Sequence, residues 1–442
     1  MSDYLPTKVL IEILSRLPVI SLLRFRCVCK SWRSLISNSS FITSHLNHST
    51  TTFNLILLRH CSHRKERFSL HFNNHTFPKF LDLKCPSSTH FKYYFRIVGS
   101  CNGLLCLTDD CFGYTNTIIL WNPSIHRSLT LPVPRVTSES TSPFMCVHGF
   151  GLDLIKNDFK VVRISYLGSE NGFKVPPQVE IYVLGDPSWR DFDGVVPRFG
   201  MVNYFWSQAY LNGKVHWVSY KLIDPVTRGC FALFFYLGNE VFGEIELPLS
   251  LVHQFPRNML TAIVGESLSV LQYDSPVYSK SCTVWVMKEY GVVGSWSKQY
   301  TIDLDGRLVL TLGLRKNGEM LLGMGRELVS YDFECQEMTN LGVSGSKDAF
   351  WVDKYMENLV LLEEGTQVVD GCSTNSSDAV NSEGEPALPE ENDGPEESLV
   401  EQRAYFMQTV CLIHLKLVFR FAEYLLLVKY MLLTFLRTSF GC

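Results

Sequence analysis

The chain has 442 residues, too many for one small domain, and its formal net charge of −4 gives no electrostatic basis for binding nucleic acid or an anionic membrane. No basic, apolar leader opens the sequence, so we expect the 14 cysteines to be reduced thiols and place the protein in the cytoplasm or nucleus. An aromatic content of 13% suits a body rich in β-strands.

The first 48 residues predict a short helical array. Pro6 suits a first helical position, and apolar residues from Val9 to Leu17 recur at helical spacing until Pro18 ends the helix. Ser21 is a plausible cap for a second helix through Val28, followed by a third over about Lys30–Ile36 and a fourth from Ser39 or Ser40 to about His48. So few helices cannot bury this many large apolar side chains, which therefore need a partner or the rest of the chain.

The spacing of two Leu-Pro pairs, Ile13-Leu14 and Trp32 resembles an F-box. An F-box is a docking element that attaches a chain to a Skp-type adaptor and, through it, to a cullin–RING ubiquitin ligase. The resemblance implies a set of adaptor-facing residues: Leu5, Pro6, Ile13, Leu14, Leu17, Pro18, Leu22, Phe25, Cys29 and Trp32.

Residues 49–363 predict an all-β domain. Short runs of β-branched and aromatic residues alternate with turns in five visible units that start about 50 residues apart, near the kelch period. Each unit has an Asn-Gly or similar turn, a hydrophobic strand and a closing segment with Trp or Leu-Pro. Four-stranded sheets arranged radially make a β-propeller, with a β-sandwich as the alternative. The strands at Phe53–Arg59 and near Phe68–Leu70 are expected to pair with Leu359–Leu362 and close the ring.

Three motifs in this region resemble the plant F-box-associated interaction domain, which follows an F-box in a large plant family. They are Gly99-Ser100-Cys101-Asn102-Gly103-Leu104-Leu105-Cys106, Leu120-Trp121-Asn122-Pro123-Ser124 and Leu211-Asn212-Gly213-Lys214-Val215-His216-Trp217. The paired glycines of the kelch signature are absent, so the domain is kelch-like only.

Candidate chemistry in the chain is sparse. Cys27, Cys29, His45 and His48 do not match the spacing of a common structural zinc site, and Cys61-Ser62-His63 has no orienting partner that the sequence reveals. Phosphate-binding loops, dinucleotide fingerprints and hydrolase elbows are missing, so neither a metal nor a cofactor is expected.

Long loops between predicted strands are candidates for target binding: Arg135–Phe144, Gly168–Pro177, Pro197–Trp206 and Tyr273–Ser281. Exposed aromatic residues are favoured interface anchors, and these loops supply Phe173, Tyr204, Phe205, Trp206 and Tyr278. The alternative is that these side chains cover neighbouring blades.

The composition changes again after the β domain. Residues 364–402 are predicted to be a disordered acidic linker, and residues 403–442 an apolar tail that we expect to be helical. Lys416, Arg420, Glu423 and Lys429 interrupt the tail, so we do not expect it to span a membrane; a weak tail anchor or a helix packed on a partner are the alternatives.

These features predict a segmental α+β chain, with a helical F-box ahead of a β-propeller. The expected function is that of a non-catalytic substrate receptor of an SCF-type ubiquitin ligase, with a Skp-type adaptor and a protein target as partners. A non-degradative scaffold and an enzyme are the competing function classes.

Overall fold

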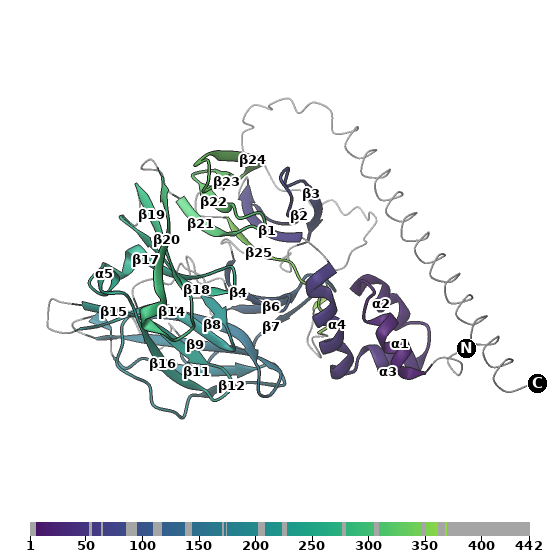
Figure 1. The fold of residues 1–442 in the computed structure, drawn as a ribbon. Coiled ribbons are helices and arrows are strands. Elements are labelled where there is room, and N and C mark those ends of the chain that lie inside the picture. Colours follow the sequence, from purple (N-terminus) through teal and green to yellow (C-terminus); the bar gives the residue numbers. More distant parts are fainter. Residues whose placement is uncertain are drawn as a thin grey trace, which may run out of the picture. The chain divides into compact units, whose positions relative to one another are not determined.

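The computed structural model describes residues 6–52, 55–62, 65–84, 95–108, 117–137, 144–169, 172–173, 175–201, 208–222, 228–275, 280–304, 309–345, 350–360 and 367–368. Four helices come first: α1 (Thr7–Leu14), α2 (Val19–Phe25), α3 (Lys30–Ile36) and α4 (Ser39–Thr52). Six antiparallel sheets follow and form the blades of a β-propeller (Figure 1). The propeller predicted from the repeats is thereby confirmed, and its blade count is six.

Blade 1 contains β1 (Leu55–Ser62), β2 (Lys65–Phe72), β3 (Lys79–Leu83) and β25 (Trp351–Lys354). Blade 2 contains β4 (Arg96–Cys101), β5 (Leu104–Thr108), β6 (Ile118–Asn122) and β7 (Arg127–Thr130), with β26 (Gln367–Val368) on the β7 edge. Blade 3 contains β8 (Phe144–Asp153), β9 (Asp158–Ser169), β11 (Gln178–Val183) and β12 (Asp186–Asp191), with β10 (Gly172–Phe173) beside β9.

Blade 4 contains β13 (Ala209–Leu211), β14 (Lys214–Leu222), β15 (Arg228–Tyr236) and β16 (Val241–Glu246). Blade 5 contains β17 (Met259–Val264), β18 (Ser267–Tyr273), β19 (Ser281–Met287) and β20 (Trp296–Asp303). Blade 6 contains β21 (Val309–Leu314), β22 (Met320–Met324), β23 (Glu327–Tyr331) and β24 (Met338–Ser344). The connections hold the short helices α5 (Leu249–Val252), η2 (Pro256–Asn258) and η3 (Val293–Ser295).

The ring closes where β25 pairs antiparallel with β1, in the register Leu57↔Asp353 and Leu58↔Val352. The expected closing strand at Leu359–Leu362 was therefore wrong by several residues. Leu359 is buried against the N-terminal helices instead, because residues after β25 leave blade 1 and run to blade 2. Blade 1 was not among the five repeat units of the sequence, because its strands come from the two ends of the β domain.

The Asn-Gly turns form as their sequence predicts. Asn102 and Gly103 have φ values of 50° and 79°, and Asn212 and Gly213 have values of 52° and 73°. Positive φ at both central residues is typical of the tight turns whose twist matches that of the flanking strands. These two turns set the pairing of β4 with β5 and of β13 with β14.

The closing Trp and Leu-Pro segments meet each other between neighbouring blades. Trp189 Nε1 of blade 3 donates a 2.7 Å hydrogen bond to the carbonyl of Pro132, directly after blade 2. Trp296 Nε1 of blade 5 donates a 3.0 Å bond to the carbonyl of Glu246, ahead of Leu247-Pro248. In both places the indole shares a hydrophobic cluster with the leucine, Leu131 or Leu247. The outer strand of one blade is thus fastened to the end of the preceding blade.

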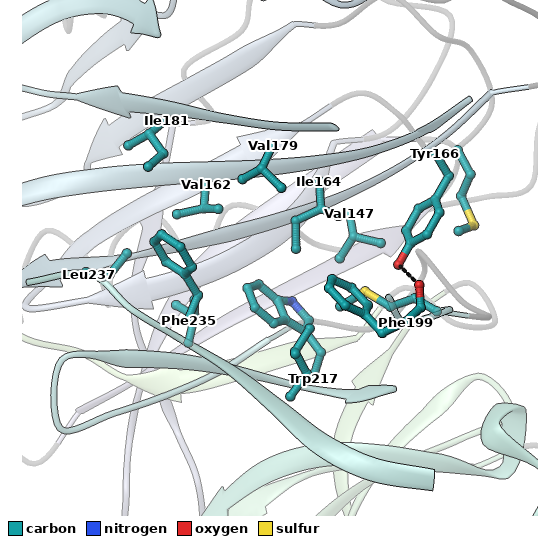
Figure 2. Packing of buried hydrophobic residues seen from close by; sticks show 14 of the residues in the cluster. Val147, Val162, Ile164, Tyr166, Val179, Ile181, Phe199, Trp217, Phe235 and Leu237 are labelled. Atoms are coloured by element: carbon teal, nitrogen blue, oxygen red, sulfur yellow. Dashed lines mark hydrogen bonds between the residues drawn. The ribbon is translucent and has the colours of Figure 1, made fainter. Parts of the chain in front are cut away.

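The main core lies between blades. Figure 2 shows one such interface, where Val162 and Ile164 of blade 3 lie near Trp217 and Phe235 of blade 4. The Tyr166 hydroxyl donates a 3.2 Å hydrogen bond to the carbonyl of Phe199, which keeps this polar atom satisfied inside the apolar cluster.

Two predicted segments lie largely outside the described residues. Of the linker predicted over 364–402 only Gln367 and Val368 are described, and they pair with Ser128 and Arg127. The whole tail predicted over 403–442 lies outside the described residues. None of the helices in the described ranges has the length and apolarity to cross a membrane.

Candidate functional site

The four N-terminal helices form a small domain around one apolar cluster. Its fully buried members are Leu14 of α1, Val19 and Leu22 of α2, Ile36 of α3 and Phe41 of α4. Pro6 and Pro18 occupy the N-cap positions of α1 and α2, where the missing proline N–H leaves no unpaired donor. The expected cap of the second helix at Ser21 was three residues late, because Pro18 takes the N-cap position of α2. The first helix, expected to continue to Pro18, ends already at Leu14.

The predicted adaptor-facing residues that the structure describes divide into three groups by exposure. Pro6 and Cys29 are exposed, and a larger group is half-buried at the rim of the cluster: Ile13, Leu17, Pro18, Phe25 and Trp32. Leu14 and Leu22 are only 1% and 0% exposed. For these two the prediction of an adaptor-facing role is corrected, because their side chains fill the core of the helical domain. Leu5 lies outside the described residues.

Three exposed apolar residues of this domain were missed as candidates. Val9 is 43% exposed, Ile20 56% and Val28 66%. The signal was available in α2, whose apolar residues Val19, Ile20, Leu22, Leu23 and Phe25 exceed the one stripe that a surface helix buries. A second stripe of this kind requires a second apolar contact, which the described part of the chain does not provide for Ile20.

The helical domain also shares its core with the propeller, beside the strands β6 and β7 (Figure 1). Ile125, in the β6–β7 turn, and Leu359, after β25, belong to the same cluster as Leu14 and Leu22. The carboxylate of Glu357 accepts a 2.8 Å hydrogen bond from the backbone N–H of Val19. The predicted boundary between the two domains is therefore a packed interface.

The segment that carries Glu357 and Leu359 is clamped by two of the sequence motifs. Asn358 Nδ2 donates a 2.6 Å hydrogen bond to the Asn102 carbonyl, and Asn122 Nδ2 donates to the carbonyls of Asn358 and Val360 at 3.1 and 3.2 Å. A Cβ atom at Gly103 would lie 2.2 Å from the carbonyl oxygen of Met356, so the close approach of this segment requires glycine there. These motif residues thus hold the attachment point of the helices.

Connections of the propeller alternate between its two ends, because successive strands of each blade are antiparallel. The turn with Ile125 joins β6 to β7, the third and fourth strands of blade 2. In every blade, the turn between the third and fourth strands lies at the same end of the propeller as the turn between the first and second strands. The long loops predicted for target binding leave strands at the other end, after β7, β9, β12 and β18. We call these the helix end and the far end.

The residues predicted for target binding are mostly outside the described ranges: Tyr204, Phe205, Trp206 and Tyr278. Phe173 lies in β10, where its backbone pairs with Gly168 of β9 at the far end. A contact of these five side chains with a target stays a prediction.

The described ranges do not bring together the ligands of a metal site. No group of three or more His, Cys, Asp or Glu side chains there could hold a metal ion. Cys27 and Cys29 are exposed free thiols, whereas His45 is buried with its Nε2 2.9 Å from the carbonyl oxygen of Leu17. All nine cysteines that the structure describes are free.

Comparison with known proteins places both parts of the chain. Residues 3–44 match the F-box domain, and residues 54–349 match the F-box associated beta propeller domain. F-box protein At3g07870 of Arabidopsis thaliana is 31% identical over 79% of this chain and 89% of its own length. F-box/kelch-repeat protein At3g23880 of the same plant is 30% identical over 67% of this chain and 79% of its own. F-box protein CPR1, also from Arabidopsis thaliana, is 25% identical over 81% and 89%.

Proposed function

Because the chain belongs to the family of plant F-box proteins that carry an F-box-associated β-propeller, we propose that it is the substrate-recognition subunit of an SCF-type ubiquitin ligase. In this proposal the helical domain binds a Skp-type adaptor and the propeller binds a protein target. In this proposal the protein binds adaptor and target in the cytoplasm or nucleus, where free thiols such as those of this chain are kept reduced.

The observation that carries the adaptor role is the second apolar stripe of the helical domain. Ile20 and Val28 are more than half exposed, although Leu22 and Val19 of the same helix region are fully buried. Binding of a partner that removes large apolar side chains from water is favourable by about 25 cal/mol for each Å² of apolar surface buried. The half-buried rim, with Phe25 packed edge-on against Trp32 at 5.2 Å between ring centroids, would extend that contact.

The proposed mechanism is proximity. The transfer of ubiquitin is performed by other subunits, and this chain raises the effective concentration of a target lysine near the charged conjugating enzyme. A packed interface between the helices and the propeller suits this role, because a flexible connection would let the target occupy many positions relative to the conjugating enzyme. Glu357 and Leu359 supply that interface on the propeller side.

The test is reconstitution with the full chain. Wild-type protein co-expressed with a plant Skp-type adaptor should co-purify with it and, once cullin, RING and conjugating enzymes are added, support ubiquitination of a bound partner. Ile20→Glu places a charge in the proposed interface and should abolish co-purification, while circular dichroism shows an unchanged β-rich fold. Thr43→Glu, at an exposed position of α4, is the matched control.

Two outcomes would contradict the proposal. Adaptor binding that survives both Ile20→Glu and Val28→Glu would exclude this surface as the docking site. A partner that binds the complete assembly and is never modified would favour the scaffold function instead.

A further inference from the structure

An arginine at the far end of blade 4 lies near two aromatic rings. The guanidinium carbon of Arg228, the first residue of β15, lies 5.5 Å from the ring centroid of Tyr220 and 6.0 Å from that of Phe255. Leu222 pairs with Arg228 in the β14–β15 register, so their side chains leave the sheet on the same face. We call Tyr220, Leu222, Arg228 and Phe255 the Arg228 corner.

The position of the Tyr220 ring beside Arg228 is set by the backbone around Gly200. Gly200 and Tyr220 exchange backbone hydrogen bonds of 2.9 and 3.0 Å. A Cβ atom at Gly200 would lie 2.5 Å from Cζ of Tyr220, so the tyrosine ring lies directly over this glycine. Tyr220 is thereby fixed between Gly200 and the guanidinium group. A guanidinium group ordered by stacking in the free protein loses less conformational entropy when it binds an anion.

Within the described ranges the charge of Arg228 has no ion-pair partner, whereas the charge of Lys221 is neutralised by a carboxylate. Lys221 points to the other face of the sheet, and its Nζ lies 2.6 and 2.7 Å from the two carboxylate oxygens of Glu244. Within the described ranges no carboxylate forms an ion pair with Arg228. Arg257 follows Phe255 by two residues and is also exposed.

Apolar surface adjoins this charge. Leu222 is 62% exposed and Phe255 51%. An arginine fork beside exposed apolar side chains is suited to a ligand that has a carboxylate next to a large apolar residue, since the fork donates hydrogen bonds to both carboxylate oxygens and the apolar neighbours exclude water from the pair.

We propose that the Arg228 corner binds a segment of the target in which an Asp or Glu stands next to a large apolar residue. This inference rests on the proposed target-binding role of the propeller and names the chemistry that its far end would recognise. The carboxylate would pair with the Arg228 fork, while the apolar side chain would lie on Leu222 and Phe255. The position at the far end keeps this contact away from the turns that pack on the helices.

The test begins with selection of random-sequence peptides on the purified full chain, followed by titration of labelled synthetic peptides by fluorescence anisotropy. We expect enriched peptides with an Asp or Glu beside Leu, Phe or Trp. Arg228→Gln should weaken their binding at least tenfold. Arg228→Lys should weaken it nearly as much, because lysine has neither the planar fork nor the stacking surface. Leu222→Ser should weaken it several-fold.

Lys221→Gln is the matched control, because it removes a positive charge one residue from Leu222 but on the opposite face. It should change affinity less than twofold, and all variants should keep the wild-type melting temperature. An enriched set without acidic residues, no enriched set at all, or equal binding by Arg228→Gln would overturn the proposal. A phosphoserine peptide that binds more than tenfold tighter than its Glu counterpart would overturn the carboxylate assignment.

Adaptor co-purification distinguishes failure of the proposed ligase function from failure of the proposed Arg228 corner. An Arg228→Gln protein that keeps both adaptor and peptide binding refutes only the role of this corner. A wild-type protein that binds acidic peptides but no adaptor refutes the ligase function and leaves the corner in place.

Discussion

The backbone N–H of Val19, at the start of α2, donates a 2.8 Å hydrogen bond to the carboxylate of Glu357, 338 residues later in the chain. Glu357 comes three residues after β25, the strand that closes the propeller ring. One side chain thus joins the first turn of α2 to the segment that follows the closing strand β25.

We predict that Glu357→Ala lowers the free energy of unfolding by about 1 kcal/mol relative to Glu357→Gln, because only glutamine keeps an acceptor for the Val19 N–H. Burial raises the pKa of the Glu357 carboxyl above its ordinary value of 4.5, although the Val19 hydrogen bond acts to lower it. The stabilisation from this group is therefore lost as pH rises above 4.5, and Glu357→Gln should be at least as stable as wild type at pH 7. Urea denaturation across pH checks both statements; a Gln variant less stable than the Ala variant contradicts the first.

The helical domain allows a direct contrast between core and surface. Leu22 is fully buried and Ile20, two residues earlier, is 56% exposed. Leu22→Ala should cost about 2–5 kcal/mol of unfolding free energy, whereas Ile20→Ala should stay within about 0.5 kcal/mol. Hydrogen exchange of the α2 amides, measured by mass spectrometry, reports the difference locally. Similar protection in the two variants would refute this division.

The two hydrogen bonds from a tryptophan indole to a backbone carbonyl should contribute independently to the free energy of unfolding. Trp189→Phe and Trp296→Phe each remove an indole N–H donor and leave the carbonyl of Pro132 or Glu246 without that partner. We expect a loss of about 1 kcal/mol for each hydrogen bond, plus a smaller loss of packing. The two sites lie in different hydrophobic clusters, so the double variant should lose the sum within about 0.5 kcal/mol. A strongly non-additive double variant would show that the blades are coupled more widely than these contacts indicate.

The stability of the closing strand should depend on pH. Burial raises the pKa of Asp353 in β25 from 3.8 to about 6, against hydrogen bonds from the Lys354 backbone and the Ser100 side chain. Because the folded-state pKa is the higher one, the stabilisation present below pH 3.8 is lost as pH rises through about 6. The advantage of Asp353→Asn over wild type should therefore grow from about pH 4 to 6 and then level off. An advantage that is flat with pH would contradict the raised pKa.

Local residue patterns predicted most of the elements and the general fold. Proline positions and apolar spacing predicted α1 and α3, and the Asn-Gly turns predicted hairpins that form with the expected positive φ values. The repeat of about 50 residues predicted a propeller, because each unit has strands for one sheet and cannot bury its own faces. All of these signals lie within a few residues of one another along the chain.

Partners distant in sequence could be decided only by the tertiary structure. Leu14 and Leu22 are as apolar as Ile20, and only packing against Ile125 and Leu359 shows which of them stays exposed. The partner of β1, the acceptor for Val19 and the Phe255 ring near Arg228 likewise come from segments more distant in the chain. Residue type and spacing determine local conformation through short-range sterics and hydrogen bonding. Burial and charge pairing, in contrast, depend on which distant segments meet, and this is a property of the whole folded chain.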